Sequence, residues 1–220
     1  MFVWLTRREG LKVNRKKVAR IMYKKGWTIK QRKKGYRPRV DGWKSIAPVP
    51  NMRWATDLAS VFCGRDGWCT FVPVVDCCTR EILGWELSTS ARSKTAERAL
   101  ENALIARFGY TYGAPKGLLL RSDNGLVFGS KNYRTLVNDY GLVQEYITPY
   151  TPEQNGLCER LIGSFKDECV WVQPGGMFKS IDEARLKIKK WVDDYNTVRP
   201  HQALNNLSPL EYLAKLQEAA

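Results

Sequence analysis

The sequence predicts an α/β fold in which helices flank a mixed, five-stranded sheet. Segments typical of strands come first and then alternate with segments of helical spacing, in the order β-β-β-α-β-α-β-α. Short turns join the first three strands and helices separate the later ones, so an antiparallel meander should be extended by right-handed parallel crossovers. With 220 residues, 44% of them hydrophobic, and eight Trp, the chain can bury the core that such a sheet needs.

Residues 1–30 are expected to form a basic helical segment that binds DNA. Residues 1–47 contain 16 Lys and Arg against 2 Asp and Glu, a net charge of +14, whereas the other 173 residues carry 20 of each sign. A concentrated basic block is typical of a protein with a polyanionic partner, nucleic acid before anionic membrane. Asn14 suits the N-cap of a short helix and Gly26 its end. The side chains expected to hold phosphate here are Lys16, Lys17, Arg20 and Lys24.

Two interpretations of this basic helix stay open. It is either the recognition helix of an incomplete helix-turn-helix, since only 13 residues precede its N-cap, or part of a basic arm with little regular structure. Residues 31–52 follow as a basic linker with three Pro and no clear period. No secretory signal or membrane span is recognisable, and six Cys with one His form no zinc pattern. We therefore expect a cytoplasmic protein with reduced, buried Cys and no membrane partner.

The core, residues 53–220, holds the predicted sheet and the later helices. Its first strand ends before Arg65-Asp66-Gly67, a turn sequence. The first core helix has apolar residues at helical spacing and ends at Gly109, and the next helix ends at Gly141. In order, the expected elements are strands 54–62, 68–76 and 81–89, helix 93–109, strand 117–123, helix 130–141, strand 142–148, a helix from 156, and helices 180–196 and 208–219.

Three acidic residues are candidates for a metal site. Asp57 lies inside the first strand, where a carboxylate fits poorly, and Asp123 follows the fourth strand. If the fourth strand crosses back beside the first, the two become neighbours at the switch point of the sheet. Taken alone, Asp57 is better explained by an ion pair or a backbone hydrogen bond, and Asp123 by a turn. With Glu159 the three carboxylates would need a counter-charge, which a pair of Mg²⁺ ions about 3.5–4 Å apart supplies in phosphoryl transfer.

Several ordered motifs resemble the catalytic core of bacterial insertion-sequence transposases of the OrfB-like integrase type. They are WATD, RSDNG and NGLCERLIGSFK, with 35 residues between Asp123 and Glu159, and the likeness runs from about Asn14 to Leu213. The resemblance implies an RNase H-like fold and Mg²⁺-dependent DNA cleavage and strand transfer, with Mn²⁺ as a substitute. By it, Asp57, Asp123 and Glu159 are the catalytic, metal-binding triad. It also implies a multimer in the active complex and, in many members, a separately encoded or frameshift-fused DNA-binding partner.

The chain departs from this family pattern at two places. Arg121 stands before Ser122 where many relatives have His, which changes how Asp123 is supported but removes no ligand. The N-terminus is shorter than the family's full helix-turn-helix region. Two rival functions stay open: an RNase H-like nuclease of the same fold that only hydrolyses, and a truncated, catalytically silent DNA-binding remnant.

Helix spacing adds one more DNA-binding candidate. Lys166 lies two turns beyond Glu159, and Gly163 between them leaves that face of the helix open. Lys166 is therefore either a phosphate contact or an ordinary solvated lysine. Tyr150 and Asn155 flank the start of the helix and are candidates for positioning or DNA contact. For His201 we expect a structural or DNA-proximal role, because metal-assisted chemistry needs no histidine base.

Overall fold

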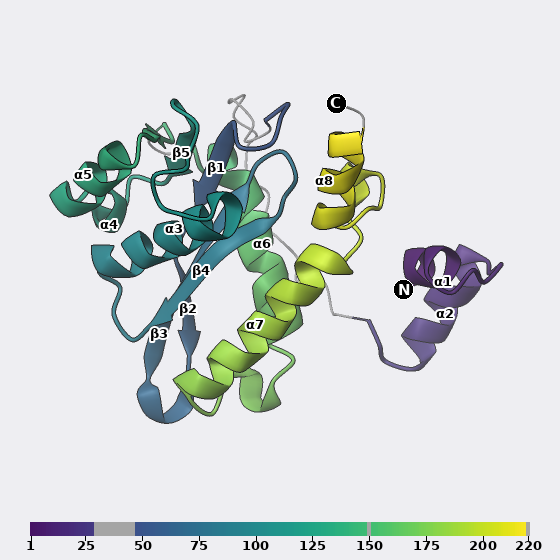
Figure 1. Ribbon diagram of the computed structural model, residues 1–220. Helices are drawn as coiled ribbons and strands as arrows, with labels where there is room; N and C mark the ends of the chain where they lie inside the picture. Colours follow the sequence, from purple (N-terminus) through teal and green to yellow (C-terminus); the bar gives the residue numbers. More distant parts are fainter. Residues whose placement is uncertain (29–46, 149–150, 219–220) are drawn as a thin grey trace.

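The structure is a computed structural model that describes residues 1–28, 47–148 and 151–218. A mixed sheet of six strands forms its centre (Figure 1). The strands are β1 (Arg53–Thr56), β2 (Ala59–Phe62), β3 (Trp68–Asp76), β4 (Ile82–Ser88), β5 (Leu119–Ser122) and β6 (Val143–Tyr146). β4 pairs with one edge of β3, whereas β1 and β2 both pair with the other edge of β3. β5 and β6 continue the sheet from β1. β3 is antiparallel to its neighbours, whereas β1, β5 and β6 are parallel, so the predicted meander with parallel crossovers is confirmed.

β1 and β2 are two parts of the single first strand that the sequence predicts. Both pair with β3 in one continuous register, in which Thr56 lies opposite Val74 and Asp57 comes opposite Pro73. Proline has no N–H to donate across such a pair. The Pro73 carbonyl accepts a hydrogen bond from Thr56 Oγ1 at 2.9 Å, so it points toward β1. The ladder is therefore interrupted at Asp57, and the expected five strands become six.

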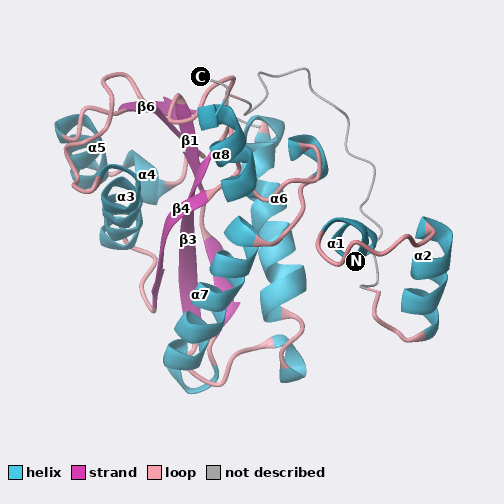
Figure 2. Ribbon diagram, turned by 45° about the vertical axis from the view of Figure 1, so that its right-hand side comes forward, coloured by secondary structure: helices cyan, strands magenta, loops and turns pink. Residues whose placement is uncertain are grey.

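Helices cover both faces of the sheet, as Figure 2 shows with the sheet almost edge-on. They are α3 (Ser93–Phe108), α4 (Leu126–Gly129), α5 (Lys131–Asp139), α6 (Gly156–Phe165), α7 (Ile181–Thr197) and α8 (Pro209–Glu218), preceded by α1 (Phe2–Arg7) and α2 (Arg15–Lys24). α3, α4 and α5 pack on one face and α6 and α7 on the other. α3 ends where predicted, at Gly109 with φ +82°. α3 lies close to β4 because Gly84 has no side chain: a Cβ there would come within 2.4 Å of the Ala103 backbone.

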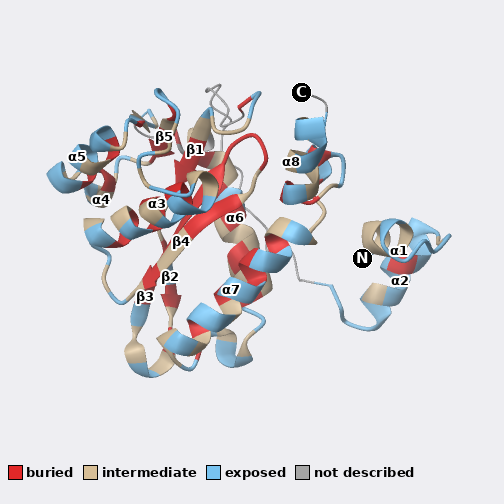
Figure 3. Ribbon diagram, viewed as in Figure 1, coloured by how far each residue is buried: buried red, intermediate tan, exposed pale blue. Residues whose placement is uncertain are grey.

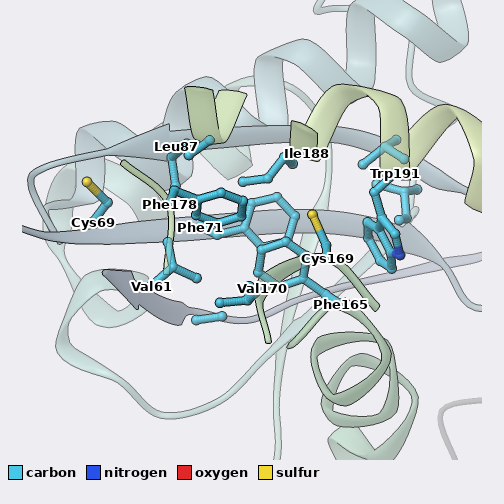
Figure 4. Close-up of a cluster of buried hydrophobic side chains, with 14 of the residues drawn as sticks. Val61, Cys69, Phe71, Leu87, Phe165, Cys169, Val170, Phe178, Ile188 and Trp191 are labelled. Atoms are coloured by element: carbon cyan, nitrogen blue, oxygen red, sulfur yellow. The ribbon is translucent and has the colours of Figure 1, made fainter. Parts of the chain in front are cut away.

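The core on the α6 side fixes that helix to the sheet (Figure 4). Phe165, the last residue of α6, stacks on Phe71 of β3 with ring centroids 4.3 Å apart. Trp191 of α7 packs on the other side of Phe165 at 5.3 Å. Aromatic pairs of this kind add about 0.5–1.5 kcal/mol each to the free energy of burial. The position of α6 relative to β3 is thus set by aromatic packing at its C-terminal end.

The N-terminal segment contains two short helices, of which only α2 was predicted. Asn14 caps α2, its Oδ1 accepting from Lys16 N at 2.8 Å, and Gly26 follows the helix with φ +66°. α1 precedes it, and Arg8, just after α1, pairs with Glu211 of α8 at 2.7 Å. Most of α2 is exposed in Figure 3; within the helix Val18 is buried and Met22 is half-buried. The division into a segment 1–30 and a linker 31–52 stays a prediction, because residues 29–46 lie outside the described residues.

The six Cys are free and buried, as expected. Across the described ranges, none of the helices has the length and apolar character needed to cross a membrane.

Candidate active site

Asp57 occupies the interruption between β1 and β2. Its carboxylate is half-buried, and its Oδ1 accepts a hydrogen bond from Leu58 N at 2.8 Å. The pKa of Asp57 is raised to about 6, chiefly by burial and in smaller part by the Asp123 and Glu159 carboxylates, while the Leu58 hydrogen bond and the Lys166 cation lower it. The strand break therefore holds a carboxylate that is poorly solvated and faces two others.

Asp123 lies beside Asp57 because β5 runs parallel to β1. Ala55 pairs with Arg121, and two residues further along both strands this register brings Asp57 opposite Asp123. The side chain of Asp123 forms a tight turn, with Oδ1 accepting from Gly125 N at 3.0 Å. A Cβ on Gly125 would come 2.9 Å from that oxygen, so a larger residue there would displace the Asp123 carboxylate. The carboxyl ends of two neighbouring parallel strands thus present one aspartate each, at the place where α/β sheets carry their sites.

Glu159 approaches this pair from the first turn of α6 and is exposed. Cys158 beside it is fully buried, and its thiol pKa is raised well above the usual value by burial first, with contributions from Asp57, Glu159 and Asp123. The start of α6 is tied to β1 by Asn155, whose Nδ2 donates to the Thr56 carbonyl at 3.4 Å. The three acids, far apart in the sequence, are therefore gathered around one region of the structure.

A partly buried ion network next to the acids was not predicted from the sequence. Glu145 of β6 accepts hydrogen bonds from Arg53 Nε at 2.9 Å and from Arg121 Nε at 2.7 Å. Arg121 also donates through Nη1 to the carbonyl of Gln154 at 2.7 Å, just before α6. Arg121 is 3% exposed. Arg121 therefore links β5 to the segment that leads into the Glu159 helix.

Comparisons with known proteins agree with this geometry. Two models described as "Integrase core domain" match residues 47–152 and 140–209. An insertion element IS407 protein of 31.7 kDa from Burkholderia multivorans is 32% identical over 222 residues, covering 98% of this chain and 75% of that protein. The chain belongs to the bacterial insertion-element transposases with an integrase core domain.

Further relatives of this transposase support the same family and fold. A putative transposase for IS986/IS6110 from Mycobacterium tuberculosis is 27% identical over 234 residues, covering 99% of this chain and 83% of that protein. The catalytic core of HTLV-2 integrase, solved in complex with magnesium, superposes with a TM-score of 0.53 at 16% identity, covering 75% of this chain and 97% of that one. The fold of the transposase is thus the RNase H-like fold of retroviral integrase cores, as predicted, and its reaction class is polynucleotidyl transfer.

The remaining predicted site residues of the transposase fall into two places. Lys166 begins a π-helical turn that continues α6, is half-buried, and lies near enough to Asp57 to lower the pKa of that carboxyl. Gly163 leaves its face open, since a Cβ there would meet no atom within 4 Å. The four cations of α2 (Lys16, Lys17, Arg20 and Lys24) are all exposed, and Figures 1 and 2 both show α2 well away from β1. Tyr150 lies outside the described residues.

The other acids of the α6 region have structural partners or remain at the surface. Glu168 pairs with Arg199 at 2.6 Å and accepts from Trp191 Nε1 at 3.2 Å. In the described part of the transposase no three His, Cys, Asp or Glu side chains already form a metal-coordinating group. The Asp57 and Asp123 carboxylates nevertheless suit a hard cation, because each uses one oxygen in a local backbone hydrogen bond and leaves the other available.

Proposed function

We propose that this transposase cuts DNA at the ends of its insertion element and joins the freed 3′ ends to target DNA by Mg²⁺-dependent in-line phosphoryl transfer. The observation that carries the proposal is the parallel register of β1 and β5, which sets Asp57 opposite Asp123 with Glu159 nearby. Three carboxylates in mutual repulsion need a cation, and hard oxygen ligands select Mg²⁺, with Mn²⁺ as a substitute.

Asp57, Asp123 and Glu159 are the proposed ligands of two metal ions. When bound, the ions would stabilise the attacking and the leaving oxygen of a phosphodiester as Lewis acids. The HTLV-2 integrase core that shares this fold was solved with magnesium, which supports the choice of ion.

The other proposed contributions come from cations. Lys166, on the Glu159 side of α6 with Gly163 leaving room, would hold a phosphate of the strand being cut. The four cations of α2 would bind duplex DNA at a second place, distant from the acids, with an affinity that falls as salt rises. Arg121 would keep the start of α6 in place through the Gln154 carbonyl. A multimer in the active complex is supported by the likeness to the simian T-cell lymphotropic virus intasome, with a TM-score of 0.59 at 17% identity.

One assay separates this proposal from its rivals. The protein is incubated with Mg²⁺ and short duplexes that carry the element ends, and the products are compared with those of Asp123→Asn. Asp139→Asn on α5, which is exposed, is the matched control with the same change of charge. Joined products that disappear only in Asp123→Asn support a transposase. Cleavage without joining indicates a nuclease. DNA binding without any cleavage, with and without an added DNA-binding partner protein, indicates a silent remnant.

A further inference from the structure

A cavity lies beside α6, next to the proposed active site. It has a volume of about 510 Å³ and opens between the turn that joins β3 to β4, the helix α6 and the segment that follows α7. Arg80 contributes from the turn, Arg160 from α6, and Arg199 and His201 from the segment after α7. Three arginines from three elements thus converge on one cavity.

Only one of these arginines has its charge balanced. Arg199 pairs with Glu168 at 2.6 Å and stacks over the ring of Tyr195 at 5.5 Å. Arg80 and Arg160 form no ion pair with any residue that the structure describes. The pKa of Arg80 is lowered, chiefly by burial; the neighbouring Tyr195 raises it in smaller part, and Arg160 lowers it. A half-buried cation beside a second cation is unfavourable unless an anion binds between them.

His201 provides an independent observation at the same cavity. It is 6% exposed and packs edge-on against Tyr195, with ring centroids 4.7 Å apart. Its Nε2 atom is buried and has no hydrogen-bond partner among the described residues, although buried polar atoms almost always have one. As a neutral imidazole, His201 can donate one hydrogen bond to an oxygen in the cavity.

We propose that this cavity binds a phosphate of the DNA backbone, with Arg80 and Arg160 as its charged ligands and the His201 imidazole as a hydrogen-bond donor. The proposal rests on the proposed function, which brings DNA to α6. Guanidinium groups match phosphate geometry with paired hydrogen bonds, and nothing else in the cavity offers a counter-charge. Arg160 follows Glu159 directly, so it projects about 100° around the helix, and Ser164 adds a hydroxyl one turn further on. α6 would therefore contact DNA on two adjacent faces.

His201 is the only histidine in the chain, so its imidazole signals in NMR report on this cavity alone. The full-length protein is titrated with a short duplex of the element end in Ca²⁺ buffer, which prevents cleavage, and separately with inorganic phosphate. We compare the wild type with Arg80→Gln/Arg160→Gln. The matched control is Arg98→Gln/Arg134→Gln, which removes the same charge from exposed positions on α3 and α5, across the sheet. Fluorescence anisotropy at several salt concentrations gives the duplex affinity of each protein.

The duplex is expected to shift the His201 signals of the wild type and of the control but not those of the cavity variant. The slope of log affinity against log salt should become shallower by about 1 to 2 in the cavity variant only. If the two Arg changes together prevent folding, Arg160→Gln alone, at an exposed position, should change the slope by about 1.

Three results would overturn the proposal. The first is a duplex that binds the wild type without moving the His201 signals. The second is equal salt slopes for the cavity variant and the control. The third is a response to inorganic phosphate with none to the duplex, which would indicate an anion from another source, such as an acidic segment of a second copy. Cleavage and joining are measured separately with Mg²⁺, so failure of the cavity can be told from failure of the proposed transposase activity.

Discussion

Arg121 offers the sharpest test of how this scaffold positions its acids. The variant Arg121→Met keeps an apolar stem of similar length but loses the hydrogen bonds to Glu145 and to the Gln154 carbonyl. Hydrogen bonds to a charged group contribute about 1.5–3 kcal/mol each. Glu145 keeps its bonds to Arg53 and is partly exposed, so we take the lower end. The free energy of unfolding should fall by about 3 kcal/mol, which for a chain of this size lowers the melting temperature by about 6–12 °C.

The effect of Arg121→Met on catalysis should exceed its effect on binding. Without the Gln154 contact the start of α6 is free to shift, and a displacement of about 1 Å at a reacting centre can cost about 100-fold in rate. In an assay run well below the melting temperature of the variant, we expect kcat for cleavage to fall by about that factor, with duplex affinity nearly unchanged. Glu145→Gln is the matched control, because it weakens the same network but leaves the Arg121 contact to Gln154 in place. Equal cleavage rates for the wild type and a folded Arg121→Met protein would refute this reasoning, as would an equal loss in Glu145→Gln.

Three further predictions follow from the same geometry. Glu159→Gln should abolish cleavage with duplex affinity and melting temperature kept, and Asp57→Asn should abolish it while raising the metal-free melting temperature, because a half-buried carboxylate facing two others is removed. The pKa of His201 is lowered to about 3, so below pH 6.5 the unfolded chain binds a proton that the folded chain does not. The contribution of His201 to the free energy of unfolding is therefore fully present above pH 6.5 and is lost as the pH falls below it. At pH 5 the loss should be about 2 kcal/mol, measured by urea unfolding, and absent in His201→Gln. Replacing the four cations of α2 by Gln should make the salt slope of duplex binding shallower by about 3–4, and an unchanged slope would exclude α2 from the interface.

Local sequence patterns predicted much of the fold because they act locally. Gly109 and Gly141 end their helices where expected, each with a positive φ, and Asn14 caps α2 with its side chain. The right-handed parallel crossovers followed from a topological rule rather than from any single residue; the pairing of β1 with β5, which the sequence offered only as a condition, is present in the structure. α1 was not predicted, since six residues carry too little periodicity to indicate a helix.

Long-range side-chain contacts were beyond the reach of sequence patterns. The network of Arg53, Arg121 and Glu145 joins three strands, and no spacing in the sequence indicates that these residues meet. The same holds for Arg80 and Arg160, which are separated by 80 positions and brought to one cavity by the packing of α6 on the sheet. Only the interruption at Asp57 had a usable signal, the proline in β3, and that signal needed the register of the pairing before it could be interpreted.

The interruption explains how a strand can carry a carboxylate at all. In an unbroken ladder Asp57 would sit on a pleated, buried surface with its backbone fully paired, and its charge would lack solvation. Because Pro73 has no N–H to donate, turning the backbone at that point gives up one ladder hydrogen bond fewer than it would opposite another residue, and Asp57 Oδ1 accepts from Leu58 N. Thr56 remains fixed from both sides, by its hydroxyl to Pro73 and by its carbonyl to Asn155. The same few residues therefore break the strand, orient the aspartate and anchor the helix of Glu159. The hydrogen bond between Asn155 and the Thr56 carbonyl thus couples the positions of two proposed metal ligands, Asp57 and Glu159.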